Sequence, residues 1–397
     1  MRFQGEVKKR IADINILPAL AIVFFVLTFT IKVFTDGAFN RGGGISPAIA
    51  YTKYATAAIA CFFAFSTMIK RGASVFSRSF NELMIVVALF TMASVVMQAS
   101  TQHVAITVYI ELIKLVMPII LAYCMLNAID EKTIYCCMEM VLIISFLGYL
   151  YDLGHSGASI LSIFQSDFSQ SDSSTEHSGL SDVSLMLSFF FLYYRKKMWP
   201  ALLSVVFCLL TFKRLAMVVV IMASVVSCFL PYLKTVCVSK RVILLCKLLT
   251  LAFVALWFWM LLPGQEKLFL DVFGETPFVF TSGRSEIMRW LLNSGFSSYG
   301  FGSANDVVKT LFGVPFEMDF IKIAFELTPI VMVIFIWVFW NVAGNQFWSL
   351  LIVGFYVLNM ITSDCLTSNF GFTLGYIVIG LVNNSEKENL LPKGASE

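Results

Sequence analysis

Charged residues are scarce in this chain, at 13% of its 397 residues, where a soluble domain has roughly 25%. Hydrophobic residues make up 58%, and the mean hydropathy is +0.83. A folded chain of this length could not bury so much apolar surface away from water, so lipid must cover most of it. The composition therefore excludes a soluble globular protein and predicts a membrane protein.

The sequence also lacks the spacings that hold metals or build a disulfide framework. Its nine cysteines include no CxxC pair, and its three histidines form no cluster. The basic residues are spread over short loops rather than gathered on one face, which argues against a nucleic-acid partner. We therefore predict no metal and no cofactor, with most cysteines acting as small buried apolar residues.

Long apolar runs recur along the chain, and a helix needs about 20 residues to cross the hydrocarbon core. They cover about residues 14–34, 46–69, 82–99, 104–126, 134–151, 182–194, 199–212, a run that starts at 215, 242–262, 319–340, 347–361 and 369–382. We predict an all-α polytopic membrane protein of about twelve spans in a single integral domain, 1–397. The sixth and seventh runs are short, which leaves open whether one of them is re-entrant.

Lys and Arg concentrate in the loops of one side, which the positive-inside rule places in the cytoplasm. This orientation puts both termini inside, including a polar tail at 383–397. It puts two long polar segments outside, at 152–181 and between the ninth and tenth spans at 263–318. We therefore expect the polar chemistry on the external face.

Basic residues stand out in these external loops. Ser282 and Gly283 precede a predicted helix that begins at Arg284 and also contains Arg289. A tight hairpin between two spans holds Lys213 and Arg214. Arginine presents a planar fork that matches phosphate oxygens, so these residues suit a diphosphate headgroup. Two plainer roles stay open, in which Arg289 pairs with nearby Glu286 and Lys213 reaches lipid phosphates.

Acidic residues gather where the tenth span begins. Glu317, Asp319 and Glu326 surround Lys322 at helical spacing, which favours either a structural network or a general base for an acceptor hydroxyl.

Glu111 and Lys114, in the fourth span, share one helix face, so they either fix helix packing or line a cavity. His155 and His177 lie in the external segment 152–181, and a single histidine in a loop is most often solvated.

Four short stretches share their order with a known family. They read TFKRLA from 211, TSGRSEIMRW from 281, SSYGFGS from 297 and FEMDFIKIAFELTPI from 316. Together with a large late external loop, this order resembles the bacterial O-antigen and capsule polymerase (Wzy) and ligase superfamily. The ligases usually have a histidine in the last cluster, where this chain has Glu317, Met318 and Asp319, which favours a polymerase.

The resemblance implies a type-C glycosyltransferase-like fold in the bacterial inner membrane, with its active face in the periplasm. The donor would be a glycan growing on undecaprenyl diphosphate, and the acceptor would be one lipid-linked repeat unit. The leaving diphosphate gains charge in the transition state, so fixed cations beside it are the main catalytic need. The candidate catalytic residues are Arg284, Arg214, Asp319 and Glu317, and the candidate substrate-binding residues are Lys213, Arg289, Lys322 and His177.

Two other functions stay open. A ligase would move a finished glycan onto lipid A core in one transfer. A lipid-linked glycan flippase or another transporter would have charges along a central path. Only Glu111 and Lys114 are identified as a charged pair in a central position, and the other polar residues gather on one face, which argues against transport. A polymerase would also work with a protein that regulates chain length.

Overall fold

The computed structural model describes residues 16–40, 46–71, 75–155, 178–367 and 370–390. Within these residues the chain is helical and has no strand, and one isolated bridge joins Cys237 and Gln346. Six helices are long and apolar enough to cross a membrane, and six shorter apolar helices coincide with the remaining predicted spans. The predicted all-α membrane protein is therefore confirmed, whereas the number of twelve spans stays a prediction.

The described chain divides into two compact units. Unit 1 comprises residues 1–77, 117–224 and 373–384, and unit 2 comprises residues 78–116, 225–372 and 385–397.

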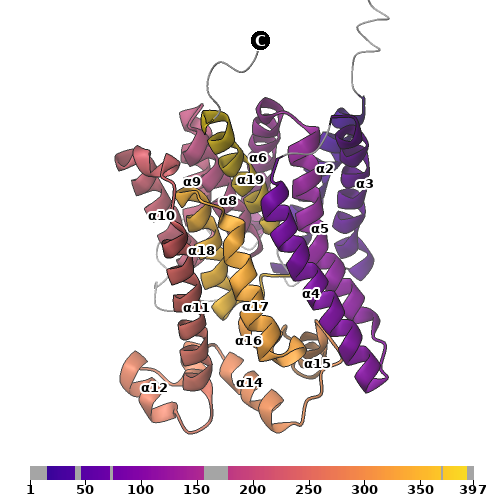
Figure 1. The fold of residues 1–397 in the computed structure, drawn as a ribbon, viewed down its shortest axis with the longest axis vertical. Helices are drawn as coiled ribbons and strands as arrows, with labels where there is room; N and C mark the ends of the chain where they lie inside the picture. The colour runs from indigo at the N-terminus through magenta and orange to yellow at the C-terminus, as the bar shows by residue number, and fades with distance from the viewer. Residues whose placement is uncertain (1–15, 41–45, 72–74, 156–177, 368–369, 391–397) are drawn as a thin grey trace, which may run out of the picture. The chain divides into compact units, whose positions relative to one another are not determined.

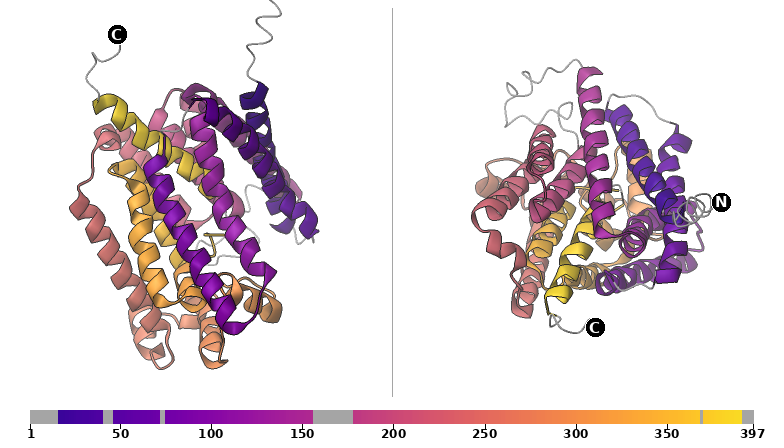
Figure 2. Two further views of the ribbon diagram at one scale, coloured as in Figure 1. Left: turned by 45° about the vertical axis from the view of Figure 1, so that its right-hand side comes forward. Right: turned by 90° about the horizontal axis from the view of Figure 1, so that it is seen from above.

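Unit 1 contains the complete helices α2 (Ile16–Asn40), α3 (Pro47–Arg71), α6 (Glu131–His155), α8 (Ser178–Tyr194) and α9 (Met198–Leu210). It also contains the second half of α5 (Ile106–Ala128) and most of α10 (Arg214–Phe229) and α19 (Gly371–Leu390). Helices α2 and α3 pack side by side (Figure 2).

Helix α8 explains how one short predicted span fits into unit 1. It packs against α9, α6 and α2, and nearly every side chain from Leu180 to Leu192 is buried. Its serines donate hydrogen bonds within the helix, from Ser184 to the carbonyl of Ser181 and from Ser188 to the carbonyl of Ser184. A helix that is apolar all round and satisfies its own polar groups is suited to burial in protein.

Unit 2 contains α4 and the first half of α5, followed by most of the C-terminal half of the chain. Apart from its part of α5, its elements are α4 (Ser77–Thr101), η1 (Pro231–Thr235), α11 (Lys240–Leu261), α12 (Glu266–Phe273), α13 (Pro277–Phe280), α14 (Arg284–Asn293), α15 (Ser303–Phe312), α16 (Asp319–Leu327), α17 (Pro329–Phe339), η2 (Trp340–Ala343) and α18 (Phe347–Thr362). In Figure 1, α12, α14 and α15 lie at the end of the unit where α11 finishes. The predicted external segment 263–318 thus folds into four short helices.

The structure adds detail at two predicted boundaries. The tail predicted at 383–397 begins as helix, because α19 continues to Leu390 through Glu386, Lys387 and Glu388, residues that favour helix. The tenth predicted span, 319–340, is broken into α16 and α17 at Thr328.

The break has a local cause. Pro329 has no N–H, and its ring disfavours helical geometry at the residue before it. Thr328 adopts φ 105° and ψ 151°, an unusual conformation for a β-branched residue. Its hydroxyl then accepts a hydrogen bond from the N–H of Val331 and caps α17.

Candidate functional site

Helix α16 holds the most deeply buried charges of unit 2. Lys322 Nζ lies 2.9 Å from Asp319 Oδ1 and 2.5 Å from Asp364 Oδ1. The side chains of Lys322 and Asp319 are only 1% and 0% exposed. A buried charge is tolerated when it is paired and hydrogen-bonded, so this lysine is held by two carboxylates.

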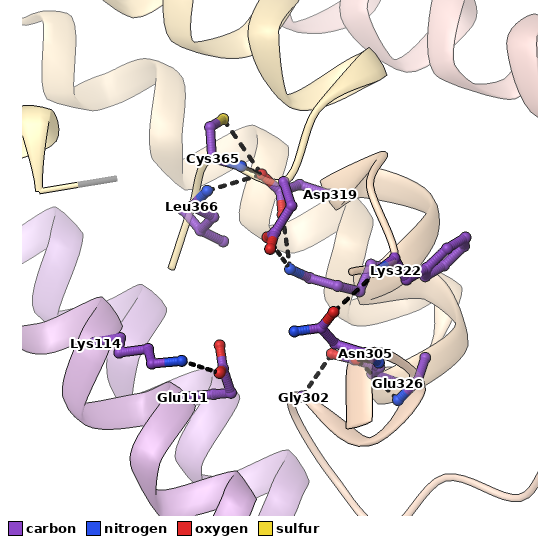
Figure 3. A network of polar contacts seen from close by, with 12 residues as sticks. Glu111, Lys114, Gly302, Asn305, Asp319, Lys322, Glu326, Cys365 and Leu366 are labelled. Atoms are coloured by element: carbon purple, nitrogen blue, oxygen red, sulfur yellow. Dashed lines mark hydrogen bonds and ion pairs between the residues drawn. The ribbon is translucent and has the colours of Figure 1, made fainter. Parts of the chain in front are cut away.

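Asp319 is itself fixed by the connection between α18 and α19. Its Oδ2 atom accepts hydrogen bonds from the backbone N–H groups of Cys365 (2.9 Å) and Leu366 (2.8 Å), and from the Cys365 thiol at 3.3 Å. Figure 3 shows Lys322 reaching Asp319 from one side and Cys365 and Leu366 from the other. These contacts join the start of α16 to residues 364–366.

Glu326, one turn further along α16, caps a neighbouring helix. Its carboxylate accepts hydrogen bonds from the N–H groups of Gly302 (2.7 Å), Ala304 (3.0 Å) and Asn305 (3.2 Å) at the start of α15. Free N–H groups and the helix dipole make this end of α15 favourable for an anion. Gly302 has φ 92°, a left-handed conformation that favours glycine, and a Cβ there would come within 2.5 Å of Glu111 Cγ. Both the backbone conformation and the close contact therefore require glycine at this position.

The pair predicted on α5 is confirmed as an ion pair. Lys114 Nζ lies 2.5 Å from Glu111 Oε1, and Figure 3 places both residues near Glu326 and Lys322. Unit 2 thus gathers four carboxylates and two lysines in one region, from α5, α16 and the 364–366 connection.

Arg284 and Glu317 form a different kind of pair. Arg284 is the first residue of α14, after Gly283 at φ 84°, so the predicted helix start is confirmed. Its guanidinium pairs with the Glu317 carboxylate and also donates a hydrogen bond to the Thr281 carbonyl at 3.2 Å. The two side chains are 29% and 32% exposed, so both remain within reach of a ligand.

Arg289 serves as a junction between helices. It lies 2.8 Å from Glu266 and 3.3 Å from Glu286, and it donates a hydrogen bond to the carbonyl of Leu261 at 3.2 Å. These partners belong to α12, α14 and the end of α11. The plainer reading of Arg289 as the partner of Glu286 is therefore confirmed, with two further contacts that the sequence did not indicate.

Unit 1 holds the remaining described candidates. Lys213 Nζ lies 3.4 Å from the buried Asp182 carboxylate, and Arg214 is exposed at the first position of α10. His177 lies outside the described residues.

Unit 1 also contains a pair that the sequence reasoning missed. Lys32 is almost fully buried in α2, where it pairs with Asp36 and donates a hydrogen bond to the Gly179 carbonyl at 3.0 Å. Lys32 and Asp36 are thus a second charged pair within a helix that is long and apolar enough to span a membrane. The spacing of four between Lys32 and Asp36 was the signal that could have revealed this second pair.

No family model, curated protein or solved structure matches this chain. The likeness to the polymerase and ligase superfamily thus rests on the four quoted stretches, and the function is argued from the site. No group of three or more His, Cys, Asp or Glu suited to a metal occurs among the described residues.

Proposed function

We propose that this membrane protein is a glycosyltransferase that polymerises oligosaccharide repeat units carried on a polyprenyl diphosphate. In this proposal it works at the periplasmic face of a bacterial inner membrane and builds an O-antigen or a related surface polysaccharide. The observation that carries the proposal is the half-exposed pair of Arg284 and Glu317. It sets a phosphate-binding side chain beside a carboxylate that is able to take a proton.

The buried charged residues of α16 support the choice of Arg284 and Glu317, because they are not accessible to a substrate. Asp319 and Glu326 are completely buried and already accept several hydrogen bonds, and Lys322 is held by two carboxylates. We therefore assign Asp319 and Lys322 to positioning the start of α16, and Glu326 to capping α15. Of the two carboxylates considered as a base, Glu317 is the one that solvent and substrate reach.

The substrate would separate Arg284 from Glu317 by taking the place of the carboxylate on the guanidinium. The donor's diphosphate carries more negative charge than Glu317 and fits the guanidinium fork, so it displaces the carboxylate from Arg284. Glu317 is then free to accept the proton of the acceptor's hydroxyl. The hydroxyl oxygen forms a bond to the donor's anomeric carbon, the bond from that carbon to the diphosphate breaks, and polyprenyl diphosphate leaves with the electron pair while Arg284 stabilises its charge.

The test uses purified full-length protein in detergent with a polyprenyl-diphosphate-linked repeat unit, and the products are separated on a gel. We expect a ladder of multiples with the unaltered chain and none with Arg284→Ala. Glu317→Gln should also lose the ladder, yet it should bind the lipid-linked donor more tightly because the competing charge on Arg284 is gone. Glu275→Gln, an exposed acidic residue elsewhere in the same segment, serves as the control and should keep the ladder.

A ladder that survives Arg284→Ala would remove the proposed role of this residue. Weaker donor binding by Glu317→Gln would contradict the exchange.

One observation favours transport as a second candidate function. Broken helices and buried charges mark the substrate sites of many transporters, and unit 2 combines the break at Thr328 with buried Lys322. A flippase would move the lipid-linked repeat unit across a proteoliposome membrane without forming a glycosidic bond. Movement with no ladder would support this candidate over polymerisation.

A further inference from the structure

The segment from α12 to α13 exposes apolar side chains although it lies outside the apolar runs. Leu268, Val272, Phe278 and Val279 are all exposed, the last three by 59%, 57% and 56%. Soluble surfaces rarely gather large apolar side chains in this way unless something covers them. The question is what covers this surface.

Helix α12 is amphipathic. Phe269 is buried, and Leu268 and Val272 flank it on one side. Lys267 and Asp271 occupy the opposite face and are exposed, whereas Glu266 begins the helix and pairs with Arg289. A short helix with one apolar and one charged face is suited to lying in the plane of a membrane surface.

The segment is fixed to the end of α11 by aromatic rings. Trp257 of α11 lies 6.1 Å from Phe269, 6.4 Å from Phe273 and 6.1 Å from Phe280, measured between ring centroids. Phe273 also lies 4.7 Å from Phe280, so α12 and α13 pack on each other as well as on α11. The contact of Arg289 with Glu266 fastens the start of α12 in the same place.

The surface of helix α11 indicates that lipid surrounds the packing site of α12 and α13. It is one of the six helices long and apolar enough to span a membrane, and only 28% of its most apolar window is buried. An exposed apolar row follows one side of it and comprises Leu245, Leu248, Leu249, Phe253, Leu256 and Trp259. Lipid must cover such a row, and tryptophan near a helix end is typical of the membrane–water interface.

We infer that α12 and α13 form a membrane-surface anchor, in which Leu268, Val272, Phe278 and Val279 enter the lipid layer around the last turns of α11. The exposed apolar row of α11 ends at Trp259, and the anchor continues the apolar surface from that level. The charged face of α12 then faces water. Its partner is bilayer lipid, and this inference holds whether or not the protein transfers sugars.

The anchor has a consequence for the polar segment that follows it. Gly283 lies three residues after the end of α13, and a Cβ there would touch the Phe278 ring at 3.6 Å. Arg284 is the next residue, so the anchor would hold this guanidinium at the level of lipid headgroups.

The experiment measures the depth of single positions in the full chain reconstituted into phosphatidylcholine nanodiscs. Serine replaces the exposed native cysteines, which are Cys136, Cys228 and Cys237. Phe278→Cys and Val272→Cys are each labelled with an environment-sensitive fluorophore, and Lys267→Cys on the charged face of α12 is the matched control. Two variants on the apolar side keep the test valid if one of them fails to fold.

Interfacial helices enter the bilayer by only about 5–10 Å, so the lipid quencher carries its nitroxide near the top of the acyl chain. We expect this lipid to quench the labels at 272 and 278 severalfold more than the label at 267, and aqueous iodide to show the reverse order. Equal iodide quenching at all three positions would overturn the anchor. Protection of 272 and 278 from both quenchers would also overturn it, because protein rather than lipid would then cover them.

Discussion

Two cation–carboxylate groups in unit 2 are close in sequence but lie in different surroundings. Lys322 is buried, and Asp319 and Asp364 hold it from two sides. Arg284 is half exposed and pairs with Glu317. Opposite charges meet in both places, yet separating them has different consequences.

The difference lies in what replaces a lost partner. Water can solvate Arg284 and Glu317 when they separate, so such a pair contributes little to stability and can exchange its partner for a ligand. Water does not reach Lys322, and removing it leaves two carboxylates uncompensated in a medium of low polarity. Burial thus separates the residues that build the site from those free to act in it.

Removing the buried cation is the most direct test of the difference between the two groups. Lys322→Met should lower the free energy of unfolding by about 3–5 kcal/mol, because Asp319 and Asp364 lose their counter-charge. Thermal unfolding of the full chain in detergent measures this. Lys309→Met, at an exposed position of α15, is the matched control and should have little effect. Equal unfolding temperatures for the two variants would contradict the structural role.

A smaller effect is expected from Glu326→Gln. The amide keeps one acceptor oxygen but turns an N–H₂ group toward the backbone donors of Gly302, Ala304 and Asn305. We expect a loss of about 1–3 kcal/mol, since buried donors lose a charged acceptor. Hydrogen exchange at these three amides should speed up, whereas Glu275→Gln should leave them unchanged. Unchanged protection in Glu326→Gln would argue that the carboxylate does not cap α15.

The pH dependence of stability offers a third test. Asp364 lies in the connection between α18 and α19, where burial raises its pKa from an ordinary 3.8 to about 7, against the opposing effect of Lys322. The folded state therefore holds a proton that the unfolded chain releases, and this contribution is present at low pH and lost as the pH rises through about 7. We expect Asp364→Asn to flatten the fall in unfolding temperature between about pH 4 and pH 7, the interval between the two pKa values.

The matched control for this measurement is Asp271→Asn, an exposed residue of α12. If both variants keep the slope of the unaltered chain, Asp364 does not titrate in this range.

The smallest change in stability is expected at the half-exposed pair of Arg284 and Glu317. Arg284→Ala should cost under about 1 kcal/mol in thermal unfolding, because water reaches both side chains and can solvate the one that remains. The same variant should nevertheless lose the product ladder, and Arg284→Lys should recover part of it by keeping the charge without the fork. A stability loss as large as that of Lys322→Met would place Arg284 among the structural residues and weaken the proposed function.

The sequence predicted the helices better than the pairing of their charges. Long apolar runs and short-range spacing located α5 with its Glu111–Lys114 pair, and Ser282 and Gly283 located the start of α14. Contacts within one or two turns follow from helical geometry, so a sequence shows them directly.

Contacts between distant segments could not be predicted in the same way. Asp364 meets Lys322 only because the connection after α18 folds back, and no spacing indicates that. The break at Thr328 is intermediate, since Pro329 signalled a bend but not a complete interruption of the helix.

The separation of Lys322 from Asp364 along the chain also bears on biosynthesis. The ribosome makes the lysine 42 residues before this partner, with α17 and all of α18 in between. Until Asp364 is made, Lys322 has only Asp319 of its two carboxylate partners, and a charge that is incompletely paired is costly to place in lipid. During translation, α16 should therefore wait at the membrane surface or inside the translocon, and the segment from α16 to residue 364 should enter its final place as a unit.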